Sequence, residues 1–166
     1  MPILVRRISR AKWDNVYENG DVDADAITQC LRTTNNELST WLIDDINEIE
    51  KAILALVSGG KQENLNTIHI IYFDEADIQN AGLELKITAG DTVAKELIEK
   101  HRDISELTYS KLASVKNIVL DCLEKDRFKT VTKGEIKGIL LKSIEDNILK
   151  LEDLHEKLSE SLTPKK

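Results

Sequence analysis

The sequence predicts an α+β fold (or a small α/β fold): a sheet of about four strands with flanking helices, followed by a C-terminal two-helix hairpin. Up to residue 103, short apolar runs bounded by turn residues alternate with helical patterns. From residue 105 to 162, the periodicity is helical and free of proline. Apolar residues make up 41% of the chain and aromatic residues 4%, which favours an aliphatic core packed by helices.

The change of pattern divides the chain into two predicted parts. A length of 166 residues suits one domain, or one domain with an appendage. We therefore expect an α/β core domain at 1–103 and a helical appendage at 104–166.

Four strands are predicted, at 2–8, 37–43, 67–73 and 83–88. The segment 67–73 is the most distinctive, because nearly every residue is apolar or aromatic and several are β-branched. Such a short run closed by acidic residues indicates a strand that is buried on both faces. The segment 83–88 alternates apolar and charged residues, which predicts an edge or half-exposed strand.

Helices are predicted at 24–32, 45–58, 75–81 and 91–101 between and after these strands. Asp45 with Glu48 resembles a capping box, and Gly59-Gly60 supplies a stop. Asp74 is expected to cap the short third helix at its N-terminus. The alternating Asp21, Asp23 and Asp25 lack the glycine and glutamate spacing of a calcium loop.

The C-terminal part predicts two helices, at 106–125 and 133–161, with residues 126–131 as the link. Thr132 and Glu135 form a capping box for the second helix. That helix would be about 45 Å long, whereas a domain of this size is about 30–35 Å across. Its coiled-coil-like stripe is therefore the predicted partner-binding or dimerisation surface: Ile136, Leu140, Ile144, Ile148, Leu151, His155, Leu158 and Leu162.

A basic cluster in and after the first strand supplies possible anion contacts at Arg6, Arg7, Arg10 and Lys12. The alternative, which the acidic segment after it favours, is an edge strand protected by its charges. Binding of nucleic acid is not expected, because the net charge of the chain is −7.

Acidic residues after the strand at 67–73 offer candidates for metal ligands: Asp74, Glu75 and Asp77. Carboxylates in this place could hold magnesium and make the protein a metal-dependent enzyme. Nucleotide hydrolysis would also need a phosphate-binding loop, and residues 58–62 lack its spacing and its hydroxyl. We expect no cofactor and no bound metal.

No motif in the sequence carries a reaction, so the leading hypothesis is a non-enzymatic interaction or accessory protein. It would act through its C-terminal helices, as a homodimer or with a protein partner. A specific form of this hypothesis is an acidic neutraliser of the antitoxin or immunity type. The alternative is the metal-dependent enzyme. Cys30 and Cys122 are expected to be reduced core residues of a cytoplasmic protein, without a signal peptide or a membrane span.

Overall fold

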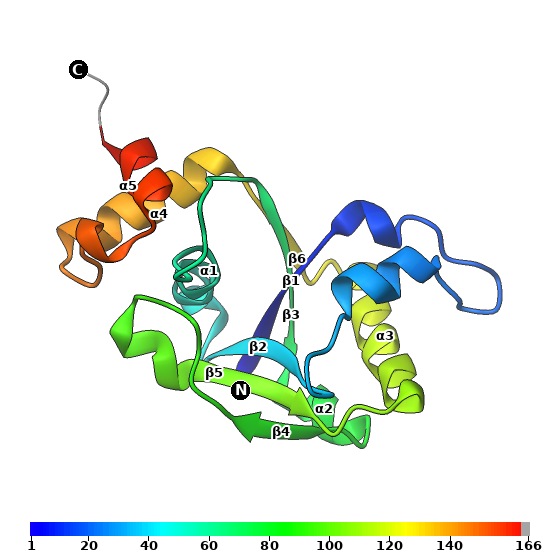
Figure 1. Ribbon diagram of the computed structural model, residues 1–166. Helices are drawn as coiled ribbons and strands as arrows, with labels where there is room; N and C mark the ends of the chain where they lie inside the picture. The colour runs from blue at the N-terminus through cyan, green and yellow to red at the C-terminus, as the bar shows by residue number, and fades with distance from the viewer. Residues whose placement is uncertain (164–166) are drawn as a thin grey trace.

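A computed structural model describes residues 1–163 and shows a mixed α+β fold (Figure 1). Six strands form one sheet in the order β4-β5-β2-β1-β3-β6, and every neighbouring pair is antiparallel. In chain order the strands are β1 (Ile3–Ile8), β2 (Leu38–Ile43), β3 (Ile68–Asp74), β4 (Glu84–Ile87), β5 (His101–Ser105) and β6 (Phe128–Val131).

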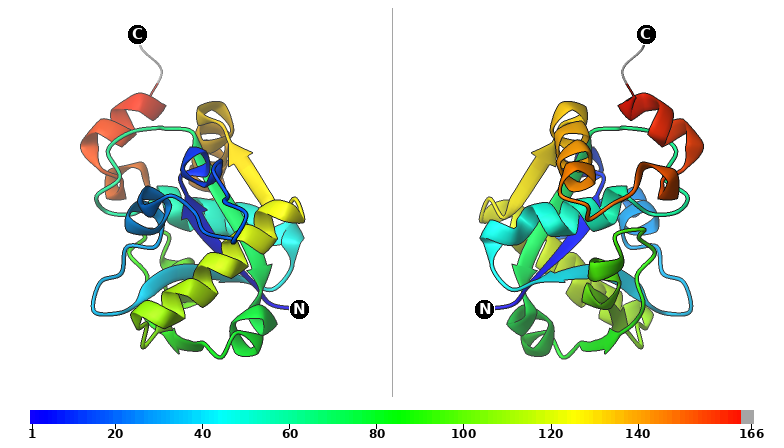
Figure 2. Two further views of the ribbon diagram at one scale, coloured as in Figure 1. Left: turned by 90° about the vertical axis from the view of Figure 1, so that its right-hand side faces the viewer. Right: turned by 90° about the vertical axis from the view of Figure 1, so that its left-hand side faces the viewer.

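Helices cover both faces of this sheet. α1 (Ile49–Val57), α4 (Lys133–Glu145) and α5 (Glu156–Leu162) lie on one face, and α3 (Tyr109–Glu124) lies on the other (Figures 1 and 2). The short α2 (Glu75–Asn80) follows β3. Short 3₁₀ or π-helical segments make up the remainder: η1 (Arg10–Trp13), η2 (Ala26–Cys30), η3 (Ile46–Glu48), η4 (Lys95–Lys100) and η5 (Leu151–Asp153).

Two apolar cores therefore sandwich the sheet, and β3 contributes to both. Ile70 packs with α1, α4 and α5, whereas Ile71 and Phe73 pack with α3 on the opposite side. This confirms that the strand predicted at 67–73 is buried on both faces. Cys30 and Cys122 are both buried free thiols, as expected.

The predicted number of strands was wrong, since β5 and β6 were missed. Residues 91–101 were expected to be helical, but only the short 3₁₀ helix η4 forms, and β5 begins at His101. Strand β6 lies in the predicted link and is four residues long. Both strands are too short to show a clear period of two, and each pairs with a strand distant in sequence, β5 with β2 and β6 with β3.

The predicted helix at 133–161 is also not continuous. The Thr132–Glu135 capping box starts α4 as expected. The helix ends at Glu145, and Asn147 adopts a left-handed backbone with φ of 60°. Asparagine tolerates this conformation and is a frequent helix terminator. The chain then reverses, and α5 packs near α4, so the predicted hairpin with one long last helix does not form.

Two further predictions concern position in the sheet. β4 lies at the edge of the sheet, as its alternating pattern predicted. β1 was expected to be a protected edge strand, but it lies inside the sheet between β2 and β3. The helix expected at 24–32 is reduced to a short segment around η2.

None of the helices in residues 1–163 combines the length and the apolar character needed to cross a membrane.

Candidate functional site

The sheet opens at one place, where β1 and β2 separate. The two strands pair only over three positions, from Ile3 opposite Ile43 to Val5 opposite Trp41. Beyond Val5, β1 continues along β3 as far as Ile8, and β2 continues along β5. The carbonyl groups that face the gap therefore need partners other than a neighbouring strand.

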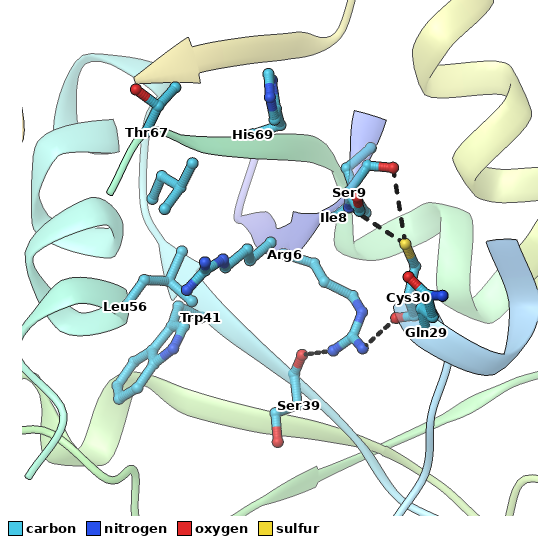
Figure 3. Close-up of a pocket in the computed structure, with 12 residues that line it drawn as sticks. Arg6, Ile8, Ser9, Gln29, Cys30, Ser39, Trp41, Leu56, Thr67 and His69 are labelled. Carbon is cyan, nitrogen blue, oxygen red and sulfur yellow. Dashed lines mark hydrogen bonds between the residues drawn. The ribbon is translucent and has the colours of Figure 1, made fainter. Parts of the chain in front are cut away.

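Arg6 is the first residue of β1 after the separation, and its guanidinium bridges the gap (Figure 3). Nη1 donates to the carbonyl oxygen of Ser39 at 2.5 Å, and Nη2 donates to that of Cys30 at 2.6 Å. Burial lowers the pKa of Arg6 to about 10, against the opposing effects of Cys30 and Asp103. Arg6 is therefore still cationic at neutral pH.

A hollow of about 440 Å³ lies at this separation, and we call it the fork pocket. Its volume falls within the range of small-molecule sites, about 300–1,000 Å³. It is lined by residues of β1, η2, β2, α1 and the start of β3. Its lining residues are Arg6, Arg7, Ile8, Ser9, Gln29, Cys30, Ser39, Trp41, Leu56, Thr67, Ile68 and His69.

Every polar side chain that lines the fork pocket can donate a hydrogen bond, and no carboxylate belongs to its lining. Arg7, Ser9, Gln29 and Thr67 are exposed, and their side chains have no hydrogen-bond partner within residues 1–163. The Nε of Arg6 is buried and also lacks a partner among these residues. The pocket thus combines the guanidinium of Arg7, which has no hydrogen-bond partner among residues 1–163, with that of Arg6, whose two Nη atoms already donate to backbone carbonyls.

His69 contributes less than its place in the lining suggests. Its Nδ1 lies 3.0 Å from the hydroxyl of Thr130 on β6. Figure 3 shows its imidazole pointing away from Arg6. The arginine side chains therefore provide the positive charge of the pocket.

A second hollow of about 310 Å³ shares Ser39, Trp41 and Leu56 with the fork pocket. Beside it, Asp103 accepts hydrogen bonds from Ser39 at 3.1 Å and Thr88 at 2.6 Å. Because the Thr88 hydroxyl donates to Asp103, His101 Nδ1, 2.7 Å away, must donate to Thr88. The network fixes the strand that carries Ser39 and Trp41.

The basic residues predicted from the sequence separate into two groups. Arg6 and Arg7 line the fork pocket. Arg10 pairs with Asp14 at 2.6 Å and lies over the ring of Phe128, and Lys12 pairs with Asp25 at 3.0 Å. These last two side chains are thus committed to contacts outside the pocket.

The acidic residues proposed as metal ligands surround an arginine. Arg127 Nη1 lies 3.2 Å from Asp77 and 3.6 Å from Asp74, and its Nη2 pairs closely with Asp121. Within residues 1–163, no cluster of three His, Cys, Asp or Glu is arranged to hold a metal. Arg127 therefore already supplies a positive charge beside Asp74 and Asp77, while Glu75 begins α2 beside them.

The residues proposed as a partner-binding stripe mostly pack inside the chain itself. Ile136, Leu140, Leu158 and Leu162 are buried in the core beside α1, and Ile144 and Ile148 pack against that core. Leu151 remains 39% exposed. His155 lies half-buried with its Nε2 3.9 Å from Glu63.

Sequence reasoning missed Ser9, Gln29, Ser39 and Thr67 as members of a site. These residues are ordinary polar types in four separate segments, so no local pattern marks them. The basic cluster on the first strand was the one signal available in the sequence. In the structure, β1 separates from β2, and Arg6 and Arg7 of this cluster line the fork pocket that lies there.

Comparisons of the chain with protein-family models, with curated proteins and with solved structures found no match. The site must therefore be interpreted from its own geometry.

Proposed function

We propose that this chain is a non-enzymatic binding protein that holds a small organic anion in the fork pocket. The observation that carries the proposal is the cationic, donor-rich lining without any carboxylate. Arg7 has a planar guanidinium that can donate two parallel hydrogen bonds to a phosphate or carboxylate group. The unused donors on Ser9, Gln29 and Thr67 can complete the contacts.

The remaining wall of the pocket indicates that the ligand also has an apolar part. Leu56 is half-buried and lines the hollow beside the polar groups, together with the small exposed parts of Ile8, Trp41 and Ile68. Burial of an apolar body against them would add affinity in proportion to its area. An organic phosphate or carboxylate fits this combination better than an inorganic ion does.

Calorimetric titration of the full chain tests the proposal, with phenyl phosphate, benzoate and inorganic phosphate as probes. We expect phenyl phosphate to bind more tightly than inorganic phosphate and its affinity to fall as salt is added. The substitution Arg7→Gln should weaken binding about 10- to 100-fold, because one charged hydrogen-bonding partner is worth about 1.5–3 kcal/mol.

The matched control is Lys12→Gln, which removes one positive charge outside the pocket. It should leave the affinity unchanged. Absence of binding by all three probes, or equal affinity of the wild type and Arg7→Gln, would contradict the proposed function.

A protein-interaction function, the leading expectation from the sequence, has less support at the C-terminal helices because their apolar residues are largely buried. Self-association finds support at a different surface, the free edge of the sheet.

A further inference from the structure

Strand β4 leaves one edge of the sheet unpaired. It pairs with β5 on one side, and the structure of residues 1–163 shows no strand on its other side. Figure 1 shows β4 along the lower boundary of the molecule. An open edge carries free backbone N–H and C=O groups that can pair with another strand.

The outer side chains of β4 include a large apolar group in water. Ile87 is 72% exposed, although it belongs to a strand. Leu83 and Leu85, which share its face of the strand, are buried and half-buried. A second strand placed along this edge would cover Ile87 and extend the apolar row.

Charges on β4 select one way in which two copies could pair. Two antiparallel copies of one strand can be related by a two-fold axis. The residue on that axis then faces the same residue of the partner subunit, and the residue before it faces the residue after it in the partner. With Leu85 on the axis, Glu84 faces Lys86 of the partner subunit, and Ile87 faces the partner's Leu83. With Glu84 or Lys86 on the axis, like charges would meet. With Ile87 on the axis, Lys86 would face the partner's Thr88 and gain no opposite charge.

We propose that two copies of this chain associate through β4, with Leu85 on the two-fold axis, so that the two sheets become one. The pairing forms two Glu84–Lys86 contacts by symmetry. Lys86 already donates to Glu37 at 2.9 Å, but its ammonium has further protons for a second carboxylate. β6, at the opposite edge, contains lysine as its one charged residue and offers no such complementarity.

The interface is short, so we expect a reversible dimer with a dissociation constant in the micromolar range. Sedimentation velocity of the full chain over a range of concentrations measures it. Glu84→Lys and Lys86→Glu each place like charges across the axis and should raise the dissociation constant about tenfold. Thermal melts would show that each variant is folded.

The double variant Glu84→Lys, Lys86→Glu restores opposite charges in the proposed register and should recover the dimer. Glu18→Lys is the matched control, because Glu18 is exposed and lies in a turn far along the chain from β4. A monomeric wild type at all concentrations would overturn the proposal. So would a dimer insensitive to the single changes, or one that the double change fails to restore.

The dimer is independent of ligand binding. The fork pocket lies between β1 and β2, and β5 separates β2 from β4. Failure of one proposal therefore leaves the other intact.

Discussion

Single arginine residues hold together parts of this fold that are distant in sequence. Arg127 contacts Asp74 and Asp77 at the start of α2 and Asp121 near the end of α3. The residue therefore joins the helix after β3 to the helix before β6. Without it, three carboxylates would face one another in a partly buried place.

We predict that Arg127→Met lowers the free energy of unfolding by about 1–3 kcal/mol, since the carboxylates lose their charged partner. Denaturant unfolding at neutral pH measures the loss. Lys125→Met is the control, because Lys125 is exposed, and its effect should stay within about 0.5 kcal/mol. Equal effects of the two changes would show that Arg127 is an ordinary surface residue.

His101 predicts a pH dependence of stability. Burial lowers its pKa, although Asp103 acts in the opposite direction. The unfolded chain therefore takes up a proton more readily than the folded chain does. The contribution of His101 to the free energy of unfolding is therefore fully present above the ordinary histidine pKa, about 6.5. It decreases as the pH falls below that value.

Melting temperatures of the wild type and His101→Gln between about pH 5 and pH 8 test this dependence. The wild type should lose stability on the acid side of this range, and the variant should show a flatter profile. Parallel profiles would mean that His101 does not titrate differently in the folded chain.

At the scale of secondary-structure elements, the C-terminal helices complete the core instead of projecting from it. The apolar residues of α4 and α5 pack with α1 against one face of the sheet. The apolar stripe was visible in the sequence, but the single continuous helix predicted to carry it does not form. Asn147 was the one local sign of the break, and an asparagine in a helical pattern is a weak sign.

A matched pair of leucine substitutions tests this packing. Leu158 on α5 is 1% exposed and Leu151 is 39% exposed. Leu158→Ala should reduce the free energy of unfolding by about 2–4 kcal/mol, because it leaves a cavity in the core. Leu151→Ala should change it by less than about 0.5 kcal/mol, and equal effects would place α5 away from the core.

At the scale of the whole molecule, the sheet and both cores combine residues from either side of the predicted boundary at 103. β6 pairs with β3 through Val131 opposite Ile68, and Val115 of α3 packs in the same core as Leu4. The α+β class was predictable, because the long buried strand and the amphipathic helices have clear periods. The order of the strands and the fork pocket were not predictable, since both depend on pairing between distant segments.

We therefore expect the chain to unfold as one unit. A chain that ends at Asp103 lacks β6, α3, α4 and α5, and it should show no cooperative thermal transition by circular dichroism. The full chain should show one transition that coincides by circular dichroism and tryptophan fluorescence. A cooperative transition in the shortened chain would instead establish residues 1–103 as an independent domain.

The central claim is that the fork pocket binds an organic anion, and mapping of backbone amide shifts by nuclear magnetic resonance tests it most directly. On titration of the full chain with phenyl phosphate, the largest shifts should fall on Arg7, Ser9, Cys30 and Thr67, which line the pocket. Arg7→Gln should suppress these shifts, and Lys12→Gln should preserve them. Shifts that are absent, or that centre on residues outside the fork pocket, would contradict the claim.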